Sequence, residues 1–287
     1  MAQEYNHKAF FELVYQKWDR VQRRPWESAV EPIKFSKNCW YIGDSWIGVI
    51  LISTEEGLIL IDAGMPGQTY LLFENIRELG FSPKDIKKIL VSHGHGDHVG
   101  ALKAVVEYTG AEVWAAAEDA AAIEGTGGTP VNMRDLPYHP AKVDKLYDWE
   151  KPIEFGGITI TPVHAPGHTD GSTAFMIDDV YVDGTPVKIG LISGVGLNGS
   201  IPDNNDMELE PYRTRRNTYR RSLEILREYP VDVAGCLHPE AVTDPPVRID
   251  GVLCAVKDHG VWTRTIDKYI QRLDKVEADA IAAASAK

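Results

Sequence analysis

The chain has 287 residues, of which 44% are hydrophobic and 25% are charged, so it has the composition of an ordinary soluble protein with a sizeable core. Its formal net charge of −12 argues against a nucleic acid as partner, because affinity for a phosphate backbone depends on cationic groups. The longest strongly apolar run, residues 46–52, is far too short to cross a bilayer, so no membrane partner is expected.

The N-terminus and the cysteines bear on the cellular location. Residues 1–20 lack the apolar region of a secretory signal. The three cysteines (Cys39, Cys236 and Cys254) are scattered and odd in number, which is typical of reduced, buried thiols. We therefore expect a cytoplasmic protein, with a mature form that has lost its signal as the alternative. A small molecule is the expected partner, and the sequence is compatible with a homo-oligomer.

The first half of the chain predicts one helix, a series of strands and then alternating elements. Residues 1–24 have apolar side chains near helical spacing, and Pro25 ends that pattern. Short β-rich runs occupy residues 33–62. The next segments predict a helix, a strand, a helix, a strand and a short helix, at residues 68–80, 86–92, 98–110, 111–116 and 118–123.

The second half begins with a loop and repeats the alternation. Residues 124–150 are rich in Gly, Pro and Asp, which predicts a long loop of the kind that more often covers a site than forms core. The pattern then predicts strands at 151–157, 158–168, 172–178 and 187–193, a helix at 210–230, a strand at 231–238 and a C-terminal helix. Its Ala-rich end, residues 278–287, is expected to fray.

Strands and helices thus alternate in two halves with no Pro- or Ser-rich linker. We predict a single α/β domain over residues 1–287, with residues 1–30 as an N-terminal helical extension and residues 260–287 as a C-terminal helix. Two mixed sheets would pack together with helices outside them, as an αββα four-layer sandwich.

The segment "SHGHGDH" (92–98) concentrates potential metal ligands. Residues i and i+2 at the end of a strand point the same way, so His93 and His95 can reach one ion if Gly94 and Gly96 permit a turn. Asp97 and His98 then begin a helix and can face a neighbouring position. Imidazole and carboxylate ligands suit zinc, with iron, manganese and cobalt as alternatives.

Four ligands do not complete two ions, so other segments must supply donors. His164 and His168 follow a predicted strand, and His238 ends another. Strand ends that meet at one edge of the sandwich would bring these side chains to the first cluster. The other histidines (His7, His139 and His259) are expected at the surface or in packing contacts.

These segments resemble the metallo-β-lactamase superfamily. "SHGHGDH" matches the H-x-H-x-D-H signature, "APGHTDGS" (165–172) resembles the third motif, and "LHP" (237–239) resembles the segment with the last histidine. "LILIDAGMP" (58–66) is also similar, with Asp62 in the position that supports the ligands. The greatest similarity is to subclass B3, through patterns such as "KNCWYIG" (37–43) and "VHAPGHTDGSTAF" (163–175), and it runs from about Glu31 to Pro239.

The resemblance implies two zinc ions. The first would be held by His93, His95 and His168, and the second by Asp97, His98 and His238. His164 would be a structural or supporting residue. Glyoxalase-type and lactonase-type members place a metal-bridging aspartate where this chain has Ser193, as subclass B3 enzymes have serine. Asp183 lies before that strand and is not expected to bind metal.

Residues 194–199, "GVGLNG", satisfy G-x-G-x-x-G, but no helix pattern follows, so a dinucleotide site is not indicated. A flexible loop at the mouth of the site fits better, with Ser193, Asn198 and Ser200 as substrate contacts.

The resemblance further implies a metal-dependent hydrolase in which a zinc-bridging hydroxide attacks a cyclic amide or ester, such as a β-lactam or a related metabolite, and Asp97 orients the hydroxide and moves its proton. We rank a B3-like hydrolase of unknown substrate above a resistance β-lactamase, because no export signal is visible. The alternatives are a lactonase or glyoxalase-like thioester hydrolase, an iron-dependent dioxygenase, and a ligand-binding protein without catalysis.

Overall fold

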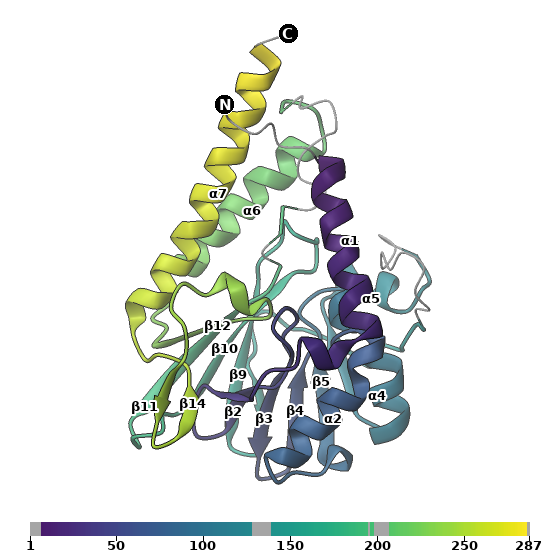
Figure 1. Ribbon diagram of the computed structural model, residues 1–287, viewed down its shortest axis with the longest axis vertical. Helices are drawn as coiled ribbons and strands as arrows, with labels where there is room; N and C mark the ends of the chain where they lie inside the picture. Colours follow the sequence, from purple (N-terminus) through teal and green to yellow (C-terminus); the bar gives the residue numbers. More distant parts are fainter. Residues whose placement is uncertain (1–6, 128–138, 195, 198–206, 286–287) are drawn as a thin grey trace.

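The computed structural model describes residues 7–127, 139–194, 196–197 and 207–285. Within these residues the strands form two sheets, one of nine strands and one of five, with helices on the outer face of each (Figure 1). The predicted αββα sandwich of two mixed sheets is therefore confirmed. That the whole chain is one domain stays a prediction.

The larger sheet comes mainly from the first half of the chain. Its strands, in spatial order, are β13 (Val247–Ile249), β14 (Val252–Cys254), β1 (Ile33–Lys34), β2 (Cys39–Tyr41), β3 (Ile50–Thr54), β4 (Gly57–Ile61), β5 (Ile86–Leu90), β6 (Glu112–Ala115) and β7 (Lys145–Leu146). Strands β4 to β7 run parallel. Because carboxyl ends of parallel strands meet at one edge, Asp62 after β4 and the histidine segment after β5 lie side by side.

The smaller sheet delivers the remaining ligands to the same edge. Its strands, in spatial order, are β12 (Val233–Cys236), β11 (Pro186–Ile192), β10 (Thr173–Val180), β9 (Ile158–His164) and β8 (Ile153–Phe155). His168 lies in the turn between the antiparallel strands β9 and β10. Ser193 and His238 follow the ends of the parallel strands β11 and β12.

Side-chain alternation along the strands explains the layers. Ile50 and Ile52 of β3 face the smaller sheet and pack in the same cluster as Phe175 and Ile189. Leu51, which lies between them, belongs to the outer cluster that α2 and α4 cover. Successive side chains of a strand point to opposite faces, so this sheet is apolar on both sides.

The helices are α1 (His7–Arg23), α2 (Thr69–Glu78), α3 (Gly96–Val99), α4 (Leu102–Thr109), α5 (Ala117–Ile123), α6 (Tyr212–Arg227) and α7 (His259–Ser285), with 3-10 turns at η1 (Pro25–Glu27), η2 (Pro66–Gln68), η3 (Pro83–Asp85) and η4 (Pro239–Ala241). Helices α6 and α7 lie beside each other against the smaller sheet, and α7 extends beyond the sheets (Figure 1). No helix within the described residues is long and apolar enough to cross a membrane.

Two predictions about elements need correction. The helix expected at 98–110 is divided into α3 and α4, because the N–H of Ala101 donates to the carbonyl of Gly64 (2.9 Å) in place of a helical partner. The expected loop 124–150 contains β7, which pairs with β6. Helix α7 continues to Ser285, and the fraying of its Ala-rich end stays a prediction.

Strands β13 and β14 were not predicted from the sequence, whereas β1 lies at the start of the predicted β-rich segment 33–62. Strands β1, β13 and β14 have only two or three residues each, too few for alternation to be seen. The three cysteines are free and buried, as the sequence predicts.

Candidate metal centre

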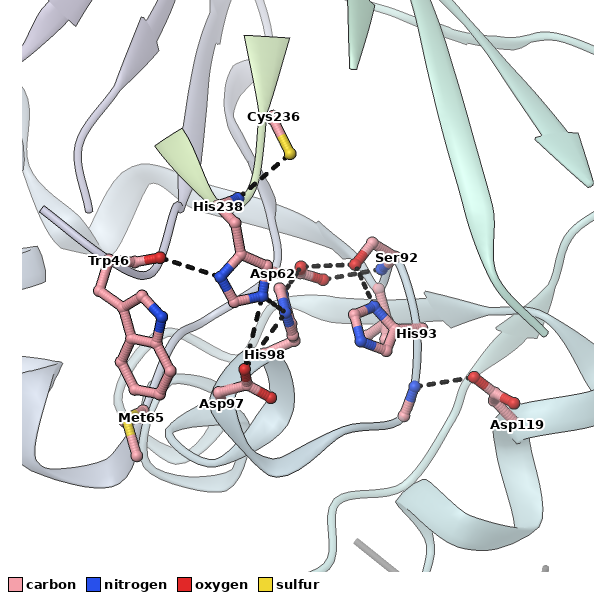
Figure 2. A network of polar contacts seen from close by, with 12 residues as sticks. Trp46, Asp62, Met65, Ser92, His93, Asp97, His98, Asp119, Cys236 and His238 are labelled. Carbon is pink, nitrogen blue, oxygen red and sulfur yellow. Dashed lines mark hydrogen bonds and ion pairs between the residues drawn. The ribbon is translucent and has the colours of Figure 1, made fainter. Parts of the chain in front are cut away.

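The histidine segment leaves strand β5 and turns directly into α3 (Figure 2). His95 is extended (φ −78°, ψ 151°) and caps α3, its carbonyl accepting the N–H of His98 (3.0 Å). Neither Gly94 nor Gly96 has a positive φ; among the nearby described residues positive φ occurs at Asp62 (64°), Gly64 (75°), Gly167 (133°) and Gly194 (66°). The turn is thus made by the helix start, with no need for left-handed glycines.

The structure brings the six predicted ligands together as two groups of three. The first group is His93, His95 and His168, and the second is Asp97, His98 and His238; within each, the ligand atoms lie within 4.8 Å of one another. The groups adjoin, since the rings of His93 and His98 are 4.1 Å apart. That these residues bind metal stays a prediction.

In the second group the carboxylate lies between two rings. Oδ2 of Asp97 is 3.7 Å from Nε2 of His98 and 3.6 Å from Nε2 of His238, and the two Nε2 atoms are 3.4 Å apart. All three atoms therefore face one point (Figure 2).

Hydrogen bonds to the other ring nitrogen fix which nitrogen of each imidazole is available. Nδ1 of His98 donates to Asp62 (2.6 Å), Nδ1 of His168 to the carbonyl of Gly196 (2.7 Å), and Nδ1 of His238 to the carbonyl of Trp46 (3.0 Å). In each case Nε2 is left for a metal, the arrangement found around metal-binding histidines.

His93 supplies the most direct test of whether the residues fit a metal. Its Nδ1 lies 3.1 Å from Oγ of Ser92, while its Nε2 is buried and has no hydrogen-bond partner among the described residues. A buried polar atom without a partner is costly. A zinc ion would satisfy it, and the nitrogen and carboxylate donors of both groups suit zinc.

The protonation states also fit metal binding. Burial, with a smaller contribution from neighbouring histidines, lowers the pKa of His93 well below its ordinary value. Burial likewise lowers the pKa to about 3 for His95 and to about 4 for both His168 and His238. These rings are neutral at pH 7, the form in which imidazole binds a metal.

Asp97 and His98 shift each other's pKa. Burial raises the pKa of Asp97, but His98, His238 and His95 lower it by more, so the carboxyl is ionised at neutral pH. For His98 the balance is reversed: burial lowers its pKa, and the carboxylates of Asp97 and Asp62 raise it above the ordinary value. The carboxylate of Asp97 and the ring of His98 thus each favour the charged form of the other.

Of the other predicted residues, some lie within the described part of the chain and some outside it. Ser193 is buried at the end of β11, and its Oγ has no hydrogen-bond partner among the described residues. Asn198 and Ser200 lie outside the described residues. His164 is outside both groups: it donates from Nε2 to the carbonyl of Asp170 (2.8 Å) and stacks on Trp149 at 4.7 Å. The carboxylate of Asp183 contacts Thr185 in an exposed turn.

Two contributors were missed from the sequence. Trp46 acts on His238 through its backbone carbonyl, which accepts the hydrogen bond from Nδ1 of that ring. Asp119 accepts hydrogen bonds from the two loops that carry the first group. The one signal in the sequence for Asp119 is an acidic residue within the Ala-rich segment 115–122, and a backbone carbonyl gives no signal because every residue has one.

A sequence model of the metallo-beta-lactamase superfamily matches residues 40–238. The chain belongs to that superfamily. The expectation of a metal-dependent hydrolase is thereby confirmed at the level of the superfamily.

Curated relatives of this superfamily member are distant. The uncharacterized protein YobT of Bacillus subtilis is 31% identical over 159 residues, which is 53% of this chain and 61% of YobT. The hydroxyacylglutathione hydrolase GloC of Haemophilus influenzae is 27% identical over 70% of this chain and 85% of GloC. Several other curated relatives are matched over only about half of their length.

Among solved structures, a subclass B3 metallo-beta-lactamase of Bradyrhizobium japonicum superposes with a TM-score of 0.75. The alignment covers 92% of this chain and 100% of that chain at 25% sequence identity. The superfamily member described here therefore shares its architecture with subclass B3 enzymes over almost its full length.

Proposed function

We propose that the chain is a zinc-dependent hydrolase of the subclass B3 type, which binds two zinc ions and cleaves a cyclic amide or ester, such as a β-lactam or a related metabolite. The observation that carries this proposal is the meeting of six donors in two adjoining groups at one sheet edge. The unpartnered Nε2 of His93 and the neutral rings of the first group support it.

His93, His95 and His168 would hold one ion, and Asp97, His98 and His238 the other. When bound, zinc supplies Lewis-acid chemistry, in that it polarises a carbonyl and lowers the pKa of water to about 7. Asp97 would orient the attacking water and accept its proton, since its carboxylate is ionised and buried between two imidazoles. No side chain of the chain is required as a covalent nucleophile.

Ser193 bears on the choice of substrate. Its buried Oγ has no hydrogen-bond partner among the described residues, and the next residue, Gly194, lies so close to His168 that an added Cβ would be 2.8 Å from Cβ of His168. We propose that this hydroxyl contacts substrate. A serine at this position favours the B3-like reaction over thioester hydrolysis, for which related enzymes carry a bridging aspartate here.

Thioester hydrolysis is the second candidate, since GloC is a hydroxyacylglutathione hydrolase and matches 70% of this chain. Both candidates are tested by one experiment. Protein reconstituted with zinc is analysed for bound metal and assayed against β-lactams, lactones and glutathione thioesters, with and without a chelator.

Two zinc ions per chain and chelator-sensitive turnover of a β-lactam or lactone would support the first candidate. Turnover confined to thioesters would support the second. Activity that persists in full after the metal is removed, or in Asp97→Asn, would overturn both.

The cytoplasmic location and the homo-oligomer stay predictions. Cell fractionation and light scattering on the purified protein would test them.

A further inference from the structure

We propose that Asp119 is the positioning residue of the first group, which is called the three-histidine group below. Its carboxylate joins the two loops that carry His93, His95 and His168, and it sets the zinc affinity of that group alone. The inference rests on the proposed zinc function, because it concerns how strongly one of the two groups binds the ion.

Asp119 lies on α5, outside the histidine segment, and its side chain is buried. Its carboxylate accepts three hydrogen bonds. The N–H of Gly94 donates to Oδ2 (2.8 Å), the hydroxyl of Thr169 donates to Oδ2 (2.8 Å), and the N–H of Gly171 donates to Oδ1 (3.0 Å). A carboxylate held by two backbone N–H groups and one hydroxyl is fixed in position and compensated for its burial.

The donors are placed next to the ligands in the chain. Gly94 stands between His93 and His95, so its hydrogen bond to Asp119 fixes the backbone that orients both rings (Figure 2). Thr169 directly follows His168, and Gly171 lies two residues further on. One carboxylate therefore holds the loop after β5 and the β9–β10 turn at a set distance. That distance determines how the ligand nitrogens of His93, His95 and His168 meet.

The fit around the carboxylate is tight on the side of the β9–β10 turn. A Cβ atom added at Gly171 would lie 2.6 Å from Cγ of Asp119 and 2.8 Å from its Oδ1. Gly171 thus lets the backbone approach the carboxylate closely enough to donate its N–H.

The second group is held by different partners. His98 donates to Asp62 and His238 to the carbonyl of Trp46. Among the described residues, Asp119 has no hydrogen bond to Asp97, His98 or His238. The effect of Asp119 on zinc affinity should accordingly be confined to the first group.

Two background variants, each lacking one ligand, allow zinc binding to be measured for one group at a time. His238→Ala leaves the three-histidine group intact, and His95→Ala leaves the group of Asp97, His98 and His238. Asp119→Asn is introduced into each background, because asparagine keeps the size of the side chain but replaces one acceptor oxygen by an NH2 group. Zinc affinity is measured at pH 7 by competition with a chromophoric chelator, and thermal unfolding of the metal-free proteins is followed in parallel.

In the His238→Ala background we expect Asp119→Asn to weaken zinc binding about 10- to 100-fold, as loss of a supporting partner does elsewhere. In the His95→Ala background we expect a change of less than about threefold. An equal loss in both backgrounds, or no loss in the first, would overturn the assignment of Asp119. Failure of the unmodified chain to bind zinc at all would overturn the proposed function as well, so the two failures are distinguishable.

The matched control is Asp179→Asn, which removes a carboxylate of similar connectivity far from the ligands. Asp179 accepts the N–H (3.0 Å) and the side-chain amide (2.8 Å) of Asn38, as well as the hydroxyl of Ser36. The variant Asp179→Asn should lower the unfolding temperature and leave zinc affinity unchanged in both backgrounds. If Asp119→Asn does not fold, Thr169→Val carries the test: it removes one donor to Asp119, and it should weaken zinc binding in the His238→Ala background only.

Discussion

Oδ2 of Asp62 lies 2.6 Å from Nδ1 of His98, and both side chains are fully buried. Asp62 also accepts the N–H (2.7 Å) and the hydroxyl (2.6 Å) of Ser92, the residue before the histidine segment. Its backbone adopts φ 64°, a conformation that is costly for a residue with a side chain. The three hydrogen bonds compensate this cost and tie the end of β4 to the segment after β5.

Replacement of this carboxylate should weaken the second group. Asparagine tolerates the left-handed backbone, so Asp62→Asn preserves the turn but removes a charged acceptor from His98. We expect zinc affinity in the His95→Ala background to fall about 10- to 100-fold, measured by chelator competition. Asp62→Ala should in addition lower the unfolding temperature, because it leaves the Ser92 N–H buried without a partner. Unchanged affinity in Asp62→Asn would contradict the role assigned to this contact.

Zinc should stabilise the folded chain. A ligand that binds only the folded state adds about 2.7 kcal/mol per site at 100 times its dissociation constant. We therefore expect excess zinc to raise the unfolding temperature of metal-free protein by several degrees, and His238→Ala to retain only part of the rise. Magnesium at the same concentration is the control and should produce no comparable shift, since the donors are mainly imidazole. Identical unfolding temperatures with zinc and with chelator would count against both groups as metal sites.

Ser193 can be tested apart from the metals. Its Oγ has no partner among the described residues, so Ser193→Ala breaks no hydrogen bond there and should change the free energy of unfolding by less than about 1 kcal/mol. Bound zinc should stay at the level of the unmodified chain. If the hydroxyl contacts substrate, KM should rise several-fold with a smaller effect on kcat, measured by steady-state kinetics on the best substrate of the panel. A loss of zinc in this variant would assign Ser193 to the metal centre instead.

The grouping of the six candidate ligands could be predicted from the sequence. Four of them fall within residues 93–98, and the resemblance to the superfamily implies His168 and His238 as the other two. The layered arrangement could be predicted equally well, because apolar strands such as β3 and β4 must be covered on both faces by other elements.

The supporting contacts could not be predicted in the same way. Asp119 meets Gly94 and Gly171 from 25 and 52 residues away, and no spacing rule relates the three. Trp46 reaches His238 across 192 residues through a carbonyl that every residue possesses. Such contacts depend on the packed arrangement of loops, which a one-dimensional pattern does not contain. The strand β7 was missed for a related reason, because its partner β6 defines it more than its own two residues do.

Glu112 on β6 makes contacts that reach both neighbouring strands, β5 and β7. Oε2 of Glu112 lies 2.7 Å from Nε1 of Trp114 and 3.0 Å from Nζ of Lys88, and Oε1 lies 3.2 Å from Nζ of Lys145 on β7. Partial burial raises the pKa of Glu112, but the hydrogen bonds from Trp114, Lys88 and Lys145 outweigh it and lower the pKa to about 2. One carboxylate thus joins three neighbouring strands.

A folded-state pKa below the ordinary value of 4.5 means that the ionised form stabilises the fold. This contribution is complete above about pH 5 and is lost as the pH falls through about 2. Glu112→Gln should therefore lower the free energy of unfolding by about 1 kcal/mol at pH 7, since solvent screens these pairs. The difference from the unmodified chain should be nearly the same at pH 5 as at pH 7 and clearly smaller at pH 3.5. It is measured by urea unfolding in excess chelator, so that zinc release does not contribute. Glu107→Gln, which removes an exposed ion pair with Lys103, is the control and should cost less than about 0.5 kcal/mol throughout. A difference for Glu112→Gln that is the same at all three pH values would show that its hydrogen bonds, and not its charge, hold the three strands together.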